Sequence, residues 1–387
     1  MRPIRESIDA LEDSLISQVW SLGRHDPEVI GLWAGEADLP TPGFISEAAI
    51  ASLRAGDTFY SHGRGIVAMR AALSNYLERL YGRPVAEDRI ALTSSGMNGV
   101  MLLAQALVGP GDSVVSVSPC WPNLLRALAI AGAEVRTVTL APGEAGWTLD
   151  LDALFAACDA TTRVICFASP GNPTGWVMER AAQETVLGFA RARGISVLAD
   201  EVYHRLVYDR PVAPSMLEIA EPEDAVYVVN SFSKAWAMTG WRLGWITYPA
   251  GQAAAFEKLI QFNTSGAPTF LQAGAIAALR DGEPFVAELL DYCRAGRAIA
   301  ESRLASMARV RAVPNSASFY SMFRVDGVAD TLSFCKRLVV EGKVGTAPGE
   351  AFGPGAEGLT RLCYAKSPAR LHEAMDRIAA FVAEYKE

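Results

Sequence analysis

Residues 230–245 read NSFSKAWAMTGWRLGW, and they place a single lysine, Lys234, among serines, aromatic residues and glycines. The chain has six lysines against 29 arginines, and Lys234 is the first of the six. Its aromatic neighbours Phe232, Trp236 and Trp245 indicate that the amine is partly buried. A buried amine without a partner has a depressed pKa or is used covalently. The simpler alternative is a lysine that snorkels from a core strand to the surface.

The composition is that of a globular protein of two or three domains. Half of the 387 residues are hydrophobic and a fifth are charged, which is enough to bury a sizeable core. The formal net charge of −8 argues against nucleic acid as a partner, since phosphate backbones require a basic surface. The first residues, MRPIRESIDALEDSL, are charged throughout, and no apolar run approaches the roughly 18 residues of a membrane span. We therefore expect no signal peptide and no membrane segment.

The six cysteines are scattered along the chain without a C-x-x-C pair, and the four histidines are dispersed. This pattern predicts no metal site, because zinc ligands recur at short spacings. It also favours a reduced, cytoplasmic compartment.

Short apolar runs alternate with helical patterns through the middle of the chain. Such alternation predicts an α/β fold, with a mainly parallel sheet buried on both faces between helices. The expected strands are RIALTS (89–94), DSVVSVS (112–118), EVRTVTL (134–140), RVICFAS (163–169), ISVLAD (195–200), AVYVVNS (225–231) and LGWITY (243–248). Among the helical patterns, the one over 179–193 ends at Gly194, as a C-cap glycine predicts.

The pattern changes near residue 283, where a long helix over 283–307 precedes a few strands and a closing helix. We expect a smaller α+β domain there. The predicted division is an N-terminal arm with part of the small domain over 1–40, a large domain over 41–282, and the small C-terminal domain over 283–387.

Polar residues follow the predicted strands, where ligands bind in parallel sheets. The turn TSSGMNG (93–99) opens a helix with free backbone N–H groups, which suits an anion such as phosphate. Each polar or aromatic side chain at a strand end is weak evidence alone, because a tryptophan there can be part of the core and a carboxylate can cap a helix. The other side chains at strand ends are Trp121, Asn172, Asp200, Tyr203, Ser231, Ser233, Lys234 and Arg242.

Together these groups match the needs of one cofactor, pyridoxal 5′-phosphate (PLP). A lysine forms an imine with it, and a carboxylate keeps its pyridine nitrogen protonated so that the ring draws electrons. Amide and phenol donors can hold the ring O3′, an indole can stack on the ring, and serines, an arginine and a helix N-terminus can neutralise the phosphate.

The chain resembles the fold-type I, class I/II aminotransferases of the aspartate aminotransferase superfamily. S-x-S-K followed by G-W-R-L-G, with PGNPTG and DEVY upstream, carries the resemblance, which runs from LWAGEADLPTP (32–42) to TRLCYAKSP (360–368). It implies an enzyme that moves the amino group of an L-amino acid to a 2-oxo acid by a ping-pong mechanism.

The resemblance also implies residue roles. Lys234 would be the Schiff-base lysine and proton shuttle, Asp200 the pyridinium partner and Trp121 the stacking ring. The remaining implied ligands are Asn172 and Tyr203 for O3′, with Asn172 also for the substrate carboxylate; Ser231, Ser233, Arg242 and the backbone of Ser95, Gly96 and Met97 for the phosphate; Arg361 for the substrate carboxylate; and Gly35 in the loop over the substrate. Tyr60 would reach the phosphate of a neighbouring subunit, which implies a homodimer with shared sites.

Two departures from the family pattern stand out. Ser95 replaces a glycine of many relatives, and its hydroxyl could add a phosphate contact. Ala317 replaces the usual glycine before an aromatic pair, so the backbone there can differ.

Other functions on the same scaffold stay open at this point. A C–S β-lyase, a decarboxylase or an elimination enzyme similar to aminocyclopropane-carboxylate synthase would use the same lysine, aspartate and arginine. A PLP-sensing transcription regulator would need a DNA-binding extension, which we do not expect in the first 30 residues.

The sequence does not identify the substrates. A dicarboxylate would require a second cation, and QFNTSGAPTFLQAG (261–274) has no arginine. Trp20, Trp33, Phe319 and Tyr320 could line an apolar pocket for aromatic or aliphatic amino acids, or could be ordinary core. Pyruvate and 2-oxoglutarate are both open as acceptors.

Overall fold

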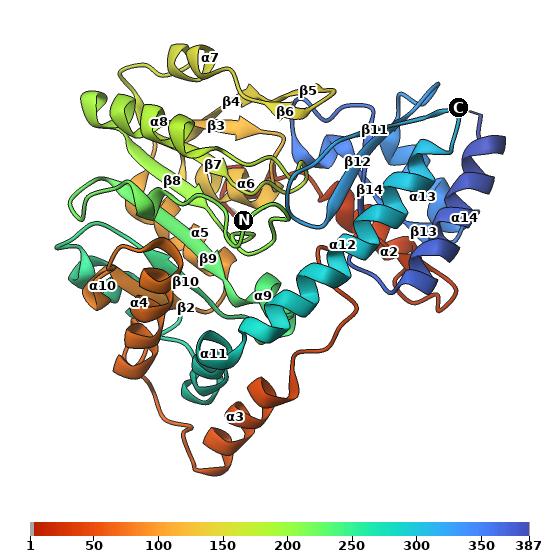
Figure 1. The fold of residues 1–387 in the computed structure, drawn as a ribbon. Helices are drawn as coiled ribbons and strands as arrows, with labels where there is room; N and C mark the ends of the chain where they lie inside the picture. The colour runs from red at the N-terminus through yellow and green to blue at the C-terminus, as the bar shows by residue number, and fades with distance from the viewer. Residues whose placement is uncertain (1–3, 387) are drawn as a thin grey trace.

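Two β-sheets organise the molecule, a computed structural model that describes residues 4–386. One sheet has seven strands and the other has four. The long helix α12 (Glu283–Ala305) runs from the side of the larger sheet to the smaller one (Figure 1).

The larger sheet has the strand order β2-β10-β9-β8-β7-β3-β4. Strand β10 is antiparallel to both of its neighbours, and the other pairs are parallel. The strands are β2 (Ile90–Thr93), β3 (Ser113–Ser118), β4 (Glu134–Thr139), β7 (Thr162–Ala168), β8 (Ser196–Asp200), β9 (Val226–Ser231) and β10 (Gly244–Thr247). Each matches one of the seven predicted runs, which confirms the predicted α/β fold with a mainly parallel sheet.

Both faces of this sheet are buried against helices, as neighbouring residues of β8 show, since successive side chains of a strand point to opposite sides. Val197 and Leu198 are both fully buried, yet they belong to separate core clusters on the two faces. Helices α5 and α6 contribute to the cluster of Leu198, and α8 contributes to that of Val197. The helices around this sheet are α3 (Gly43–Arg54), α4 (Val67–Tyr81), α5 (Gly96–Leu107), α6 (Pro122–Ala131), α7 (Leu151–Ala156), α8 (Arg180–Arg193), α9 (Phe232–Ala235), α10 (Ala253–Gln261) and α11 (Thr269–Asp281). Helix α8 ends as predicted, with Gly194 in the left-handed conformation at φ 64°.

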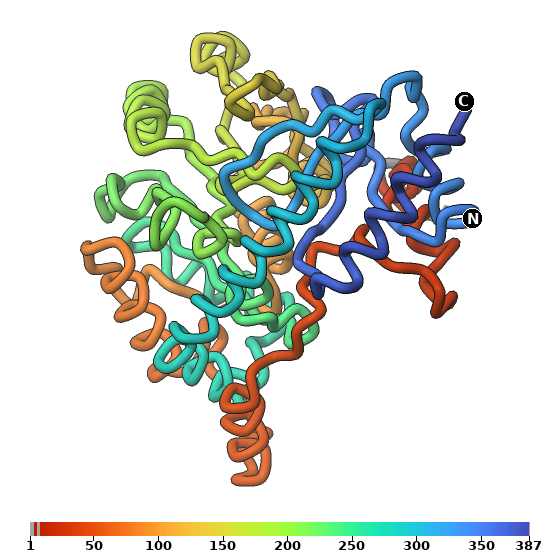
Figure 2. The backbone as a smooth tube through the Cα atoms, turned by 45° about the vertical axis from the view of Figure 1, so that its right-hand side comes forward, coloured from red at the N-terminus to blue at the C-terminus, as the bar shows by residue number. Residues whose placement is uncertain are grey.

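The smaller sheet is antiparallel, with the order β11-β12-β15-β14. Its surroundings include both ends of the chain, because β1 pairs with β13 and α2 packs on α13. Figure 2 shows the red N-terminal segment beside the blue C-terminal elements. The elements are β11 (Val310–Val313), β12 (Tyr320–Val325), β13 (Val344–Gly345), β14 (Ala347–Pro348), β15 (Leu359–Cys363), α13 (Thr331–Val340), α14 (Pro368–Glu384), β1 (Ile30–Gly31), α1 (Glu6–Asp9) and α2 (Leu15–Gly23).

Short elements complete the chain. They are the hairpin β5 (Ala141–Gly143) and β6 (Gly146–Thr148), and the 3₁₀ turns Glu87–Arg89, Met216–Glu218, Thr239–Trp241 and Gly349–Phe352. Within residues 4–386, no helix is both long enough and apolar enough to cross a bilayer.

Candidate active site

A cavity of about 410 Å³ lies where the parallel strands of the larger sheet end. Strands β8 and β9 contribute their last residues, and the connections after β3 and β7 contribute further side chains. The cavity is lined by twelve of the fourteen predicted site residues: Gly35, Gly96, Met97, Trp121, Asn172, Asp200, Tyr203, Ser231, Ser233, Lys234, Arg242 and Arg361.

The other two predicted residues lie outside the lining. Ser95 is buried one residue before α5, and its hydroxyl accepts a hydrogen bond from the Asn98 N–H at 2.9 Å. This hydroxyl is therefore already used as the helix cap. Tyr60 is 95% exposed and does not enter the cavity of its own chain.

Lys234 belongs to the short helix α9, directly after β9. Its Nζ donates a hydrogen bond to the carbonyl oxygen of Gly35 at 2.5 Å and lies 5.7 Å from the centre of the Tyr203 ring. Burial lowers the pKa of the Lys234 amine to about 8. About a tenth of the amine is thus neutral, and nucleophilic, at pH 7, far more than for a lysine with its ordinary pKa of about 10.4.

Asp200 is the last residue of β8 and is buried. One carboxylate oxygen accepts a hydrogen bond from the Val202 N–H at 3.1 Å. Within residues 4–386, no lysine or arginine forms an ion pair with this carboxylate. Burial raises the pKa of Asp200 to about 6, although its backbone hydrogen bond and the charge of Lys234 oppose the shift. The described residues thus leave this buried carboxylate without a cation paired to it.

Arg361, on β15, brings the smaller sheet into the site. Its guanidinium donates to the Asn172 Oδ1 at 2.8 Å and to the carbonyl oxygen of Trp33, and it lies 4.3 Å from the centre of the Tyr320 ring. The Nε is buried without a hydrogen-bond partner. A buried, oriented guanidinium with a free donor suits a carboxylate ligand.

Tyr320, on β12, is a site residue whose role the sequence analysis missed. Its hydroxyl lies 2.6 Å from the hydroxyl of Tyr203, and its ring lies under Arg361. A Cβ atom at residue 35 would lie 1.9 Å from the Tyr320 hydroxyl oxygen, so only glycine fits there. The aromatic pair in NSASFYSMF was the available signal, but it did not distinguish a site residue from core packing.

The N-terminus of α5 forms an anion cradle. The N–H groups of Gly96 and Met97 have no acceptor within the helix, as is general for the first turn. A Cβ atom at residue 244 would lie 2.5 Å from the Gly96 nitrogen, so the glycine on β10 permits this close approach. Ser231 donates to Ser233 at 2.9 Å beside the cradle, and Arg242 lines the same cavity.

The four aromatic residues considered for an apolar pocket lie in different places. Trp20 is partly exposed, and Phe319 packs edge-on against Tyr203 in the core. Trp33 lines the cavity, but its ring is packed on Gly345, where a Cβ atom would lie 1.8 Å from it. Of the four side chains, that of Tyr320 is the one that lines the cavity and also bonds another lining residue, through its hydroxyl to Tyr203.

An amine with a lowered pKa, a buried carboxylate, a buried guanidinium and a helix N-terminus lie around one cavity, a combination typical of an enzyme site that binds anionic groups. Comparison with known proteins identifies the class. Residues 27–378 match the family model "Aminotransferase class I and II". The chain belongs to this family, whose members use PLP.

Individual relatives agree with this assignment. The chain is 32% identical to an aspartate aminotransferase of Thermotoga maritima, over 92% of each chain. It is 31% identical to an arginine–pyruvate transaminase of Pseudomonas aeruginosa, over 92% of this chain and 91% of the other. Aspartate aminotransferase of Thermus thermophilus, in a single-mutant form, superposes with a TM-score of 0.91 at 30% identity, over 98% of this chain and all of the other. The predicted function is confirmed: the protein is an aminotransferase that moves an amino group from an amino acid to a 2-oxo acid.

Proposed function

We propose that this chain binds PLP in the cavity at the strand ends and transaminates amino acids there, with Lys234 as the catalytic residue. The observation that carries the proposal is the convergence of Lys234, Asp200 and Arg361 on one cavity of about 410 Å³. This volume is in the range of pockets that hold small ligands and cofactors.

The residues present fit the cofactor at each of its polar groups. Asp200 is a buried carboxylate without a cationic partner among the described residues, and a protonated pyridine nitrogen would supply one. Tyr203 and Asn172 are the donors assigned to O3′, and Trp121 is assigned to the ring face. The phosphate is assigned to Ser231, Ser233 and Arg242, and to the N-terminus of α5 with Ser95, Gly96 and Met97.

When bound, PLP supplies an electron sink for the pair released at the substrate Cα. The chain's own residues would bind the substrate, move the proton and limit access of water. Arg361 would hold the substrate α-carboxylate, and its hydrogen bonds to Asn172 and to the Trp33 carbonyl keep the plane of its guanidinium fixed. The neutral form of Lys234 would take the proton from the substrate Cα, and the protonated form would return it to the C4′ carbon of PLP. Gly35 accepts a bond from Lys234, so the loop that carries it lies over the amine and limits access of water.

The assembly proposed is a homodimer in which Tyr60 reaches the phosphate bound by the partner subunit. Exposed apolar residues support an interface around this tyrosine, because Phe59, Val67 and Phe262 are 84%, 65% and 88% exposed. The backbone of Phe59 is joined to the first residue of α11, because the Thr269 hydroxyl donates to the Phe59 carbonyl. The site is incomplete in a single chain under this proposal.

The compartment proposed is the cytoplasm, with amino acids and 2-oxo acids as the small-molecule partners and no nucleic acid or membrane. All six cysteines are free thiols, which suits a reducing environment.

The test is a visible absorption spectrum of the purified protein before and after adding single amino acids without a 2-oxo acid. A bound-PLP band that gives way to the pyridoxamine form, with one 2-oxo acid released per site, would support the proposal and name the donor. A band that persists while pyruvate and ammonia accumulate would instead indicate a lyase. Absence of the band after PLP has been added would contradict the assignment of Lys234.

A further inference from the structure

The charges that line the cavity are few, and the proposed function uses all of them. Four of the lining residues are charged: Asp200, Lys234, Arg242 and Arg361. Under the proposed function, three of these serve the cofactor and Arg361 serves the substrate α-carboxylate. Among the described residues that line the cavity, no cation is left for a second carboxylate on the substrate.

The rest of the lining is uncharged and mainly apolar. Ile16 from α2, Ala34 beside Gly35, and Val202 after β8 contribute apolar surface, and Asn123 contributes a neutral amide. A carboxylate placed among such groups would lose its hydration without gaining a counter-ion, which is strongly unfavourable. A methyl or thioether group would gain from the same surroundings.

A second cavity, of about 220 Å³, adjoins the first, since Asn123 lines both. Its lining contains one cation, Arg126, which forms an ion pair with Glu12 at 2.6 Å. The same lining contains the acidic residues Asp13 and Glu350. Among residues 4–386, the lining of this second cavity is therefore net negative, and its cation Arg126 is already paired with Glu12.

The segment around Tyr60, which the proposed dimer would bring to a neighbouring site, offers no free cation either. Arg64 in this segment donates to the carbonyl oxygens of Asp88 and Ile90 and to the Tyr248 hydroxyl. It also lies 3.7 Å from a carboxylate oxygen of Glu257. These contacts hold the guanidinium on its own subunit.

We propose that this site selects amino acids with uncharged, apolar side chains and rejects dicarboxylates, and that Glu12 contributes to the rejection by neutralising Arg126. The inference rests on the proposed function, because it assumes that Arg361 takes the α-carboxylate and Lys234 the Cα proton. Both half-reactions use one cavity, so the preferred 2-oxo acid acceptor is a monocarboxylate as well.

The first experiment compares kcat/KM of the holoenzyme for methionine and glutamate, which have side chains of similar length and different charge. Leucine and aspartate form a second pair. We expect at least about a tenfold preference for the uncharged member of each pair. Equal or faster turnover of glutamate and aspartate would overturn this inference and leave the proposed function standing. Failure to transaminate any amino acid would overturn the proposed function itself.

The second experiment tests Glu12 with the variant Glu12→Gln, which frees Arg126. We expect kcat/KM for aspartate to rise about two- to fivefold, as is typical for a partly exposed charge, with no change for leucine. The matched control is Glu373→Gln, which frees Arg377 from a similar surface ion pair on α14 and should change neither value. An unchanged ratio of aspartate to leucine turnover in Glu12→Gln would contradict the role given to Glu12.

Discussion

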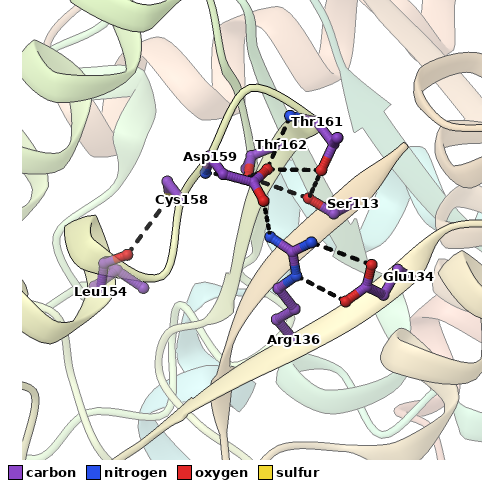
Figure 3. Close-up of polar contacts among 8 residues, drawn as sticks. All are labelled: Ser113, Glu134, Arg136, Leu154, Cys158, Asp159, Thr161 and Thr162. Carbon is purple, nitrogen blue, oxygen red and sulfur yellow. Dashed lines mark hydrogen bonds and ion pairs between the residues drawn. The ribbon is translucent and has the colours of Figure 1, made fainter. Parts of the chain in front are cut away.

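The two ends of the seven-stranded sheet differ in how completely their charged side chains are paired. At the amino ends of β3, β4 and β7, Arg136 forms ion pairs with Glu134 at 2.8 Å and with Asp159 at 2.5 Å, and neighbouring hydroxyls complete the network (Figure 3). At the carboxyl ends, and among residues 4–386, the Asp200 carboxylate accepts one backbone hydrogen bond, and the amine of Lys234 donates only to the Gly35 carbonyl.

The two aspartates show the difference most directly. Hydrogen bonds from Thr161 and Arg136 hold the pKa of Asp159 well below its ordinary value, whereas burial raises the pKa of Asp200 to about 6. One end of the sheet satisfies its charges internally and contributes to stability. The other end keeps charges buried and underpaired, which costs stability and leaves them available to a ligand.

The largest effect we expect is from Lys234→Ala. Loss of the amine removes the base for the Cα proton, and turnover should fall at least about ten thousandfold. The measurement is kcat with the best donor of the amino-acid panel. The control is Lys258→Ala, an exposed lysine on α10, which should retain activity within about twofold of the wild-type value. Normal turnover by Lys234→Ala would contradict the central assignment.

Asp200→Asn should reduce kcat about a thousandfold, because the neutral amide no longer favours a protonated ring nitrogen. The same change should stabilise the cofactor-free protein by about 3 kcal/mol at pH 7, since it removes a buried carboxylate whose pKa is raised from 3.8 to about 6. The raised pKa makes ionisation unfavourable to folding, so the gain should vanish below pH 4 and grow as the pH rises to about 6. Urea unfolding of the apoprotein at pH 4 and pH 7 measures this difference. If Asp200→Asn were less stable than the wild type at pH 7, the conclusion that the buried charge of Asp200 costs stability would be wrong.

Tyr320→Phe tests whether the Tyr320 hydroxyl, which lies between the two sheets beside Tyr203 and Arg361, contributes to catalysis. It removes the hydrogen bond to Tyr203 and retains the ring under Arg361, so kcat should fall about fivefold while KM changes little. Tyr364→Phe is the control, because that hydroxyl bonds Tyr208 and the Ser318 carbonyl outside the cavity lining. An equal loss of kcat in both variants would indicate a structural effect.

The smallest effect should come from Asp159→Asn, at the amino ends of the strands, where the charges are paired. Activity should not change, and the melting temperature should fall slightly at pH 7. Because the pKa of Asp159 is lowered in the folded protein, its contribution is present above the ordinary pKa near 3.8 and is lost as the pH falls. The melting temperatures of variant and wild type should therefore converge in acid. A stabilised variant at pH 7 would contradict this prediction.

The sequence predicted the larger sheet well because parallel strands buried on both faces appear as continuous apolar runs. It also pointed to the residues at the carboxyl ends, since the motifs around Lys234 and Asp200 lie directly after such runs. The roles given to them, and the division of the chain at residue 283, stay predictions. What the sequence did not reveal depends on contacts between distant segments. The pairing of Tyr203 with Tyr320 joins residues 117 positions apart, and the neutralisation of Arg126 by Glu12 joins residues 114 positions apart.

The pairing of β1 with β13 has a consequence for the order in which the protein is made. All seven strands of the larger sheet have been synthesised once residue 247 has been added, and Lys234 and Asp200 can reach their places after this segment has emerged from the ribosome. Strand β1 must wait for Val344 and Gly345, almost a hundred residues later, before it has a partner. Domains generally fold as units from the N-terminus during synthesis. The wall of the site that contains Gly35 and Arg361 is thus assembled last, although Gly35 is translated long before Lys234.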